Sequence, residues 1–276
     1  MRRWRLLVAS PLPGRLNMAL DEALLRLHER GLCPPTLRLY RWQPPALSLG
    51  RFQPRPHLEP EVLRHLGLEV VRRPTGGRAV LHLHEITYAV VAGSAEGLPS
   101  SPGAAYHLLC QGLLAALGLL GVEAELGREA AKPPEPEVCF LRQTRADIIC
   151  RGRKFVGSAQ TWRGSSLLQH GSIVLAPQAA ELAALFRADP DELGGRVTSL
   201  SEILGRPACA AEVARAVVAG FAEALGACFQ AGGLSPQEWS MAWSLAWSPA
   251  WPAEQEQAWS CSRTTPASPS AACPSA

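Results

Sequence analysis

The sequence predicts an α+β (mixed α/β) protein, built as a single domain with a mixed β-sheet flanked by helices. Two observations lead to this prediction. Short segments with alternating apolar residues occur in hairpin-like groups, and apolar helical stripes lie between these groups rather than after every strand. The chain has 276 residues, of which 47% are apolar and 18% charged, so it can bury a core without cross-links. A disordered or collagen-like chain is excluded.

The first hundred residues alternate helix and strand patterns. Leucines and alanines at residues 19–27 form a helical stripe that Gly31 can terminate before Pro34 and Pro35. Alternating apolar residues and flanking turns predict strands at 37–40, 47–49 and 68–72, and a helix at 60–66. Thr75-Gly76-Gly77 indicates a tight turn, after which residues 78–91 are expected to form one long β segment.

The second half begins with a strongly apolar stretch that predicts a helix at 104–120. A Pro-rich loop, 132–136, then leads to Cys139. Residues 146–150 and 154–159 form a hairpin pattern around Arg151-Gly152-Arg153, and a third strand is predicted at 167–175. The remaining helices are expected at 178–186, 201–204 and 212–225.

Composition changes near Leu234. Residues 235–276 carry five of the eight tryptophans and only four charged residues, and they end in a run rich in Ser, Pro and Ala. We therefore predict a folded domain over 1–234 and a poorly ordered tail over 235–276. The spacing of four between the first tryptophans also fits one aromatic helix face, for a partner or a membrane surface, which Pro249 and Pro252 would interrupt. A shifted reading frame would give the same composition.

Charge and cysteine content exclude several classes of function. The 27 basic and 24 acidic residues leave a net charge of +3, too small and dispersed for a nucleic-acid-binding face. The eight cysteines contain no C-x-x-C pair, so neither a zinc site nor a disulfide framework is indicated. The apolar stretch at 6–9 is too short for a secretory signal, and no run approaches the roughly 18 residues that cross a bilayer. We expect a cytoplasmic protein with reduced thiols and no membrane association.

Three segments could carry chemistry. In the stretch 72–82, paired glycines allow backbone N–H groups to approach an oxygen or phosphate, and the arginines add positive charge, although Gly-Gly also occurs in ordinary turns. Cys139 follows a Pro-rich loop, and several cations follow it within 15 residues, which favours a thiolate. Lys154 is one of only two lysines, and small residues follow it, which leaves room for a ligand beside a compact ammonium.

Taken in order, these segments resemble the lipoate-protein ligase and biotin-protein ligase superfamily. The segments that carry the resemblance are Asn17–Ala23, Leu37–Gln53, Arg72–His82, Gly152-Arg153-Lys154 and Leu168–Ser172. Cys139-Phe140 directs the resemblance to the octanoyltransferase branch, LipM. The chain departs from the pattern at Leu83, where an acidic residue is usual, and from Ser240 onward, where the family has a helical C-terminus.

The resemblance implies a lipoate/biotin-protein ligase-like fold and an acyltransferase of lipoate biosynthesis and protein lipoylation. Cys139 would be the nucleophile that takes an octanoyl group from octanoyl acyl carrier protein as a thioester. The acceptor would be a lysine of a lipoyl domain, such as glycine cleavage H protein. Lys154 would stabilise the thiolate and the developing oxyanion. We expect a monomer that uses no cofactor and no metal.

The expected substrate-binding residues come from the same motifs. They are Arg73, Gly76, Gly77, Arg78, Ala79, Val80, His82, Gly157, Ser158, Ala159, His170, Gly171 and Ser172. Arg142, Arg145, Arg151 and Arg163 are candidates for docking an acidic carrier, or for an ordinary solvated surface.

Three alternatives stay open at this point. An ATP-dependent lipoate-protein ligase would use Lys154 on the carboxylate and phosphate, and Gly76-Gly77 to cradle the adenylate. An amidotransferase between two lipoyl domains would keep the same residues and chemistry. A non-catalytic lipoyl- or carrier-binding protein would explain Leu83 and the unusual tail.

Overall fold

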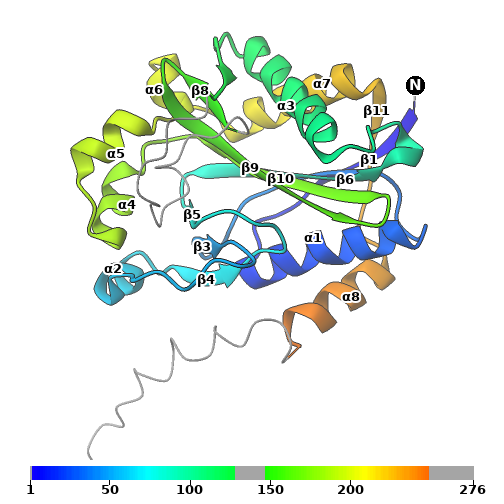
Figure 1. The fold of residues 1–276 in the computed structure, drawn as a ribbon, viewed down its shortest axis with the longest axis horizontal. Coiled ribbons are helices and arrows are strands. Elements are labelled where there is room, and N and C mark those ends of the chain that lie inside the picture. The colour runs from blue at the N-terminus through cyan, green and yellow to red at the C-terminus, as the bar shows by residue number, and fades with distance from the viewer. Residues whose placement is uncertain (1, 128–146, 249–276) are drawn as a thin grey trace, which may run out of the picture.

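A computed structural model of the chain describes residues 2–127 and 147–248 (Figure 1). Within them, the main sheet has the strand order β11-β1-β2-β6-β10-β9-β8-β7. Its strands are β1 (Arg2–Val8), β2 (Thr36–Tyr40), β6 (Glu85–Gly93), β7 (Glu125–Leu126), β8 (Ile148–Cys150), β9 (Arg153–Arg163), β10 (Ser166–Val174) and β11 (Ala227–Ala231). Strand β1 is parallel to β2 and β11, and the other neighbours are antiparallel, which confirms the predicted mixed sheet.

A second, three-stranded sheet has the order β4-β3-β5. It contains β3 (Ala46–Leu49), β4 (Glu69–Arg72) and β5 (Val80–His82). The prediction of one long β segment over 78–91 is wrong, because the chain leaves the small sheet after His82 and enters the main sheet at Glu85. Leu83 packs into the apolar cluster of the small sheet, whereas Ile86 packs into that of the main sheet.

Helices cover both faces of the main sheet (Figure 1). Helix α1 (Gly14–Glu29) lies on one face, and α3 (Pro102–Leu119) and α7 (Ala210–Leu225) lie on the other. Successive side chains of a strand point to opposite faces, and along β6 Ala89 and Val91 pack toward α1 while Tyr88 and Val90 pack toward α3 and α7. The shorter helices are α2 (Pro60–His65), α4 (Ala179–Phe186), α5 (Pro190–Arg196) and α6 (Leu200–Leu204).

The sequence predicted no run long enough to cross a membrane, and helix α3 corrects this prediction. Its length and composition would allow it to cross a bilayer. Its side chains instead enter the core. Leu109, Leu113 and Leu117 are buried in the same cluster as Phe221 of α7 and Tyr88 of the sheet. We therefore interpret α3 as a core helix of this fold.

The C-terminal part of the description corrects the expected tail. Helix α8 (Pro236–Ala246) begins with a capping box formed by Ser235 and Glu238, and its buried Ala242 and Ala246 pack on α1. The prediction of poor order is therefore wrong for residues 236–246, while residues 249–276 lie outside the described residues. The tryptophan spacing did indicate a helix face: Trp239, Trp243 and Trp247 are all exposed on α8 or at its end.

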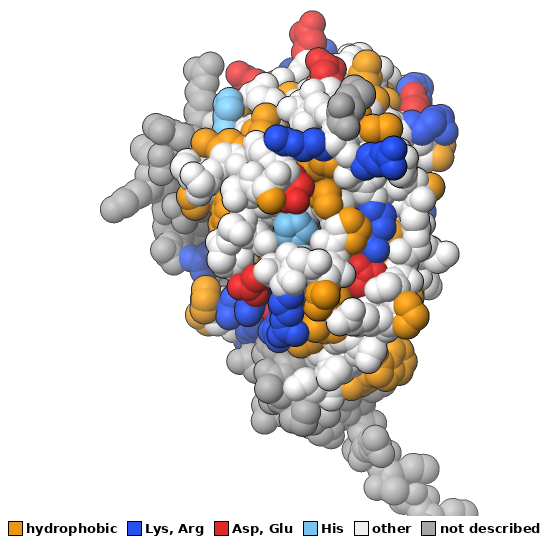
Figure 2. Space-filling model, turned by 90° about the vertical axis from the view of Figure 1, so that its right-hand side faces the viewer, with side chains coloured by type: hydrophobic (Ala, Val, Ile, Leu, Met, Phe, Trp, Pro, Cys, Tyr) orange, Lys and Arg blue, Asp and Glu red, His pale blue; other side chains and the backbone are white. Residues whose placement is uncertain are grey.

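The surface at the end of the molecule that holds the N-terminus carries mixed charges. Figure 2 shows basic and acidic side chains interspersed over this face. Arg163, a candidate for docking an acidic carrier, pairs instead with Glu29 of α1, with 2.9 Å between Nε and Oε2. Arg151 is exposed in the turn between β8 and β9, and Arg142 and Arg145 lie outside the described residues.

A buried ion pair anchors α8, and its loss should destabilise the protein. The Arg5 guanidinium on β1 donates to both oxygens of Glu238, at 2.6 and 2.9 Å, and the side chains are only 12% and 1% exposed. In Glu238→Gln, Arg5 would keep its charge in a site that excludes water. We expect the free energy of unfolding to fall by about 1–3 kcal/mol in chemical denaturation.

The control is Glu212→Gln. It removes a charge from the ion pair with Arg206, whose side chains are 34% and 48% exposed. This change should cost clearly less stability than Glu238→Gln, because exposed ion pairs contribute little. Equal losses in the two variants would contradict an anchoring role for Glu238.

Candidate functional site

A pocket opens where α1, the main sheet and the small sheet meet. Its empty space, counted to the open mouth, is about 440 Å³. It is lined by Met18, Tyr40, Trp42, Ser48, Arg73, Gly77, Val80, His82, Thr87, Gly157, Ser158, Ala159, His170, Gly171 and Ser172.

Two glycines in neighbouring strands keep the sheet close-packed beside this pocket. Gly171 of β10 lies opposite Ser158 of β9, and a Cβ atom at Gly171 would lie 2.6 Å from the carbonyl oxygen of Gly157 and 2.6 Å from Ser158 Oγ. No larger residue fits there without a shift of the backbone. A Cβ atom at Gly157 would lie 3.2 Å from Lys154 Cε, so glycine also leaves room for the lysine side chain.

The Gly-Gly turn is built around a buried guanidinium. Arg73 is 6% exposed and donates to the carbonyl oxygens of Ser48 at 3.0 Å, Gly76 at 2.7 Å and Arg78 at 2.8 Å. Gly77 adopts a positive φ of 96°, which favours glycine. Much of the hydrogen-bonding capacity of Arg73 is therefore used to hold the turn, although its side chain also borders the pocket.

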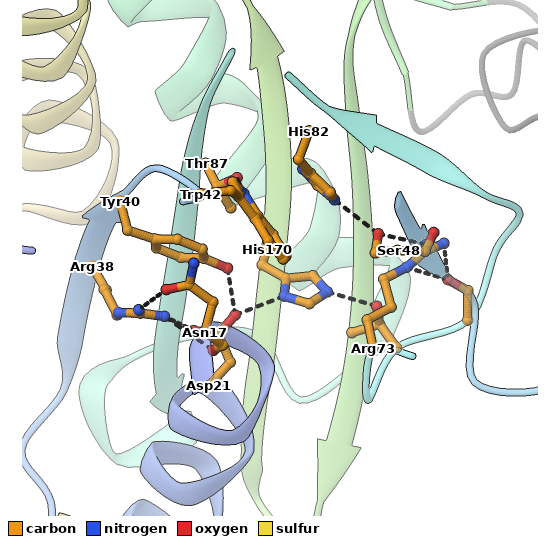
Figure 3. Close-up of polar contacts among 12 residues, drawn as sticks. Asn17, Asp21, Arg38, Tyr40, Trp42, Ser48, Arg73, His82, Thr87 and His170 are labelled. Carbon is orange, nitrogen blue, oxygen red and sulfur yellow. Dashed lines mark hydrogen bonds and ion pairs between the residues drawn. The ribbon is translucent and has the colours of Figure 1, made fainter. Parts of the chain in front are cut away.

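His82 contacts the hydroxyl of Ser48 at one side of the pocket (Figure 3), and a carboxylate faces its other ring nitrogen. Its Nε2 is 2.8 Å from Ser48 Oγ, and its Nδ1 faces Glu85 at 3.6 Å, beyond hydrogen-bond distance. The ring stacks on Trp42 with centroids 3.9 Å apart. Burial lowers the pKa of His82, and the nearby Glu85 carboxylate opposes that shift only in part, so the ring is neutral near pH 7.

Glu85 also explains the departure at Leu83. The position directly after the motif histidine is apolar and packs into the core of the small sheet. The carboxylate that faces His82 comes from Glu85, three residues after the histidine, where it also accepts a hydrogen bond from Thr87 at 2.8 Å. The indole N–H of Trp42 donates to the same Thr87 hydroxyl at 2.8 Å. An acidic group is thus present next to the histidine.

His170 connects α1 to the Gly-Gly turn (Figure 3). Its Nδ1 lies 2.9 Å from Asp21 Oδ2, and its Nε2 lies 2.7 Å from Thr75 Oγ1. An ionised carboxylate only accepts, so Nδ1 donates to Asp21, and in the neutral ring Nε2 accepts from the Thr75 hydroxyl. Both ring nitrogens are therefore occupied, which fixes the orientation of the ring at the pocket wall.

Asp21 holds several buried polar groups together. Arg38 donates to its Oδ1 at 2.7 Å, and the Tyr40 hydroxyl donates to its Oδ2 at 2.8 Å. Burial by itself would raise the pKa of Asp21, but Arg38, His170 and Tyr40 together hold it below the usual value. The carboxylate is therefore ionised at neutral pH although it is fully buried.

Lys154 forms a buried ion pair next to Gly157. Its Nζ lies 2.8 Å from Asp147 Oδ1, and the two side chains are 1% and 5% exposed. The hairpin of β8 and β9 brings the two residues together, because Asp147 directly precedes β8 and Lys154 lies at the start of β9. A lysine that was predicted as a compact donor is thus present as the cationic half of an ion pair.

Most of the residues that the sequence predicted as substrate-binding meet at the pocket. Arg73, Gly77, Val80, His82, Gly157, Ser158, Ala159, His170, Gly171 and Ser172 line it. Gly76, Arg78 and Ala79 are not among the lining residues, and Ala79 is fully buried in the core of the small sheet. Cys139 lies outside the described residues, so its place relative to the pocket is not defined.

Several pocket residues were missed at the level of the sequence. Met18, Tyr40, Trp42, Ser48 and Thr87 line the pocket but were not among the predicted site residues. Four of them lie in the motif segments 17–23 and 37–53, so those motifs were a usable signal. Asp147, which pairs with Lys154 beside the pocket, lies in none of these motifs. Only the fold of the hairpin shows that it faces Lys154.

No group of three or more His, Cys, Asp or Glu side chains among residues 2–127 and 147–248 is arranged to hold a metal ion. The cysteines within these ranges are free thiols. Among the lining residues the cation is Arg73, whereas Lys154 is fully buried and does not line the pocket.

Comparison with known proteins identifies the family. A family model described as the lipoyl protein ligase A/B catalytic domain matches residues 13–222. The chain belongs to this family. The match spans the segments that carried the resemblance in the sequence, which is thereby confirmed.

Curated relatives of this lipoyl protein ligase A/B member carry the name octanoyltransferase LipM. The protein of Kyrpidia tusciae is 41% identical over 254 residues, which cover 86% of this chain and 93% of that protein. The protein of Symbiobacterium thermophilum is 41% identical over 250 residues, which cover 85% of this chain and 91% of that protein.

Solved structures confirm the predicted fold class. A lipoate-protein ligase A bound with ATP has a TM-score of 0.76 and 26% identity, and the match covers 89% of this chain and 94% of that one. A bi-partite lipoate protein ligase from Thermoplasma acidophilum, described with its E2 lipoyl domain, has a TM-score of 0.73. It is 23% identical, with 89% and 92% of the two chains covered, and supports the fold alone.

The lowered pKa of His82 predicts a pH dependence of stability. The folded protein keeps this ring neutral, so below the ordinary histidine pKa of about 6.5 the unfolded chain binds more protons. Stability from this residue is complete above that pH and decreases as the pH falls toward the folded pKa. The slope for one proton is at most about 1.4 kcal/mol per pH unit.

The measurement is the free energy of unfolding by denaturant between pH 7.5 and 5.5. We expect the wild-type protein to lose more stability over this range than His82→Gln, which has no ring to protonate. His107→Gln, at an exposed position of α3, is the matched control and should follow the wild type. Parallel curves for wild type and His82→Gln would contradict the prediction.

Proposed function

We propose that this chain is an octanoyltransferase that moves an octanoyl group from octanoyl acyl carrier protein to a lysine of a lipoyl domain. The observation that carries the proposal is the 41% identity to octanoyltransferases over more than four fifths of the chain, against 26% to the ligase structure of the same fold. The enzyme is accordingly an acyltransferase. A carrier-bound octanoyl donor and a lipoyl acceptor, such as glycine cleavage H protein, complete the proposed reaction.

The proposed reaction has two steps on Cys139. The thiolate attacks the carbonyl carbon of the carrier thioester, and the carrier thiol leaves, so that one thioester replaces another. The neutral amine of the target lysine then attacks the enzyme thioester. An amide forms, the amine proton is released, and the Cys139 thiolate leaves. Dividing the transfer in this way replaces one difficult encounter with two feasible ones.

The pocket suits an acyl chain held by burial. Met18, Tyr40, Trp42 and Val80 contribute apolar surface to it. At roughly 0.8 kcal/mol for each CH₂ group, six methylenes contribute on the order of 5 kcal/mol of binding. This is enough to distinguish an octanoyl group from short acyl groups, and the few polar side chains at the pocket wall would orient the carbonyl end.

Lys154 is the proposed donor to the developing oxyanion. An ammonium is a compact donor with three N–H groups, and Asp147 accepts from one of them. Removing one such donor commonly costs about 3–4 kcal/mol of transition-state stabilisation. The ion pair with Asp147 is close to electroneutral, so we assign Lys154 to hydrogen bonding with the oxyanion more than to long-range stabilisation of a thiolate.

One alternative is an ATP-dependent lipoate-protein ligase, which the structural similarity to a lipoate-protein ligase A bound with ATP supports. Purified protein, octanoyl acyl carrier protein and apo lipoyl domain should be combined without ATP. Octanoylated lipoyl domain, detected as a mass gain, is the expected result. Modification that appears only with ATP and free octanoate would overturn the proposal.

The donor protein is tested in the same assay. An octanoylated lipoyl domain replaces the carrier as donor, with an apo lipoyl domain of different mass as acceptor. Faster transfer from the lipoyl domain than from the carrier would make the chain an amidotransferase between lipoyl domains. If neither donor supports transfer, the chain would be a non-catalytic protein that binds a lipoyl domain or a carrier.

Replacement of Cys139 should abolish transfer. Wild type mixed with octanoyl carrier alone should gain the mass of one octanoyl group on the peptide that contains Cys139, and Cys139→Ser should gain none. The control is Cys228→Ser, at an exposed position of β11, which should behave as the wild type. Full activity in Cys139→Ser would exclude the covalent mechanism.

Lys154→Arg should reduce kcat strongly although it keeps the charge. The side chain is fully buried beside Gly157, and the larger guanidinium cannot occupy the same position. We expect a loss of about 10²–10³ in kcat, as for a missing oxyanion donor. Arg151→Lys, in the exposed turn of the same hairpin, is the control, and a near-normal rate in Lys154→Arg would exclude a role for a compact donor.

A further inference from the structure

The ion pair of Lys154 points to a residue that no motif of the sequence singled out. We propose that Asp147 is a positioning residue for acyl transfer, which keeps Lys154 as an ammonium and holds its Nζ beside Gly157, a residue of the pocket wall. Asp147 acts through Lys154 and has no direct contact with the acyl group. The proposal rests on the proposed function for its catalytic meaning, but the state of the lysine can be tested without it.

The geometry places the carboxylate where the lysine needs it. Asp147 Oδ1 lies 2.8 Å from Lys154 Nζ, and both side chains are at least nine-tenths buried. The backbone around the pair is also fixed. The carbonyl oxygen of Asp147 accepts from the N–H of Gly127 at 2.7 Å, and the carbonyl oxygen of Lys154 accepts from Thr198 at 2.9 Å. Neither residue can move far without breaking these bonds.

Burial makes the charge of this lysine depend on its partner. A buried ammonium without an anion gives up its proton, because the interior disfavours the charged form. A carboxylate at hydrogen-bond distance reverses that preference. Asp147 therefore favours the charged form of Lys154, and the charged form is the stronger donor to an oxyanion.

Two titratable groups of α3 near the pair supply no negative charge at neutral pH. Tyr106 and Cys110 of α3 both interact with Asp147. Burial, more than the Asp147 charge, raises the pKa of Tyr106 and raises that of Cys110 to about 12. On the neighbouring turn, Arg153 pairs with Glu202 of α6 at 3.5 Å, at positions 37% exposed. Neither group of α3 competes with Asp147 as an anion for Lys154, to which Asp147 is paired at 2.8 Å.

This assignment separates two roles for Lys154 that have opposite dependence on pH. A neutral lysine would act as a base, and its contribution would increase as the pH rises. A lysine held as an ammonium acts as a donor, and its contribution is lost as the pH rises and the proton leaves. Removing the Asp147 charge should therefore move this loss to lower pH.

The first test observes the lysine directly. The chain has only two lysines, so full-length protein labelled with ¹³Cε-lysine gives two side-chain signals, and Lys132→Arg identifies the one from Lys154. In the wild-type protein, Lys154 should stay charged through pH 10. In Asp147→Asn, its titration midpoint should fall by about 1 to 5 pH units, as for other buried lysines, while the Lys132 signal is unchanged.

Equal midpoints in the two proteins would overturn the proposal. If Asp147→Asn does not fold, the titration of the wild-type protein still tests the proposal. A Lys154 side chain that loses its proton below pH 10 would overturn the proposal as well. This readout needs no substrate. It therefore keeps a failure of this proposal distinct from a failure of the octanoyltransferase function, which the transfer assay measures.

The second test uses the transfer reaction. Asp147→Asn should lower kcat at least tenfold at pH 8 with little change in KM for the carrier, and the fall of kcat at high pH should begin at a lower pH than in the wild type. Asp147→Glu should recover part of kcat and restore the wild-type profile. Glu202→Gln, which breaks the exposed pair with Arg153, should leave both unchanged. A uniform loss without a shift of the profile would indicate a structural role only.

Discussion

The buried carboxylate of Asp21 joins the parts of the molecule that form the pocket. It accepts from Arg38 and Tyr40 at strand β2 and from His170 on β10, and His170 in turn contacts Thr75 in the Gly-Gly turn. A buried charge is costly unless hydrogen bonds satisfy it. Because its partners lie on two strands of the main sheet and one of them also contacts the turn, Asp21 is stable only when α1, the main sheet and the turn are in their observed places.

The pocket itself lies at the boundary of two sheets. Several polar groups in its wall and beside it are paired within the protein: Arg73 with turn carbonyls, His82 Nε2 with Ser48, and, next to Gly157, Lys154 with Asp147. Buried polar groups that are paired in this way hold their orientation in the absence of substrate. The glycines of β9 and β10 permit the close approach of these strands beside the site. The site is therefore preorganised by contacts that do not involve the substrate.

The sequence predicted the elements with strong local periodicity. The predicted helix at 104–120 corresponds closely to α3, and the one at 212–225 corresponds to α7. The predicted hairpin around 151–153 corresponds to the turn between β8 and β9. It missed β1 and β11, whose residues make sense only against their partners, and it gave the helix of α8 only as an alternative to a poorly ordered tail. Strand β1 lies between β2 and β11, and α8 depends on Arg5 from the opposite end of the chain. Contacts between such distant residues leave no local pattern.

For the site, the motifs alone determined the family and most of the residues that line the pocket, because glycines, histidines and a rare lysine stand out in a chain of this composition. Only the tertiary structure showed that Glu85 supplies the acidic neighbour of His82, that Arg73 is used to build the turn, and that Asp147 is paired with Lys154. Charge and hydrogen bonding depend on distances of a few ångström and on burial. These are set by how strands pair and helices pack, and spacing along the chain does not reveal them.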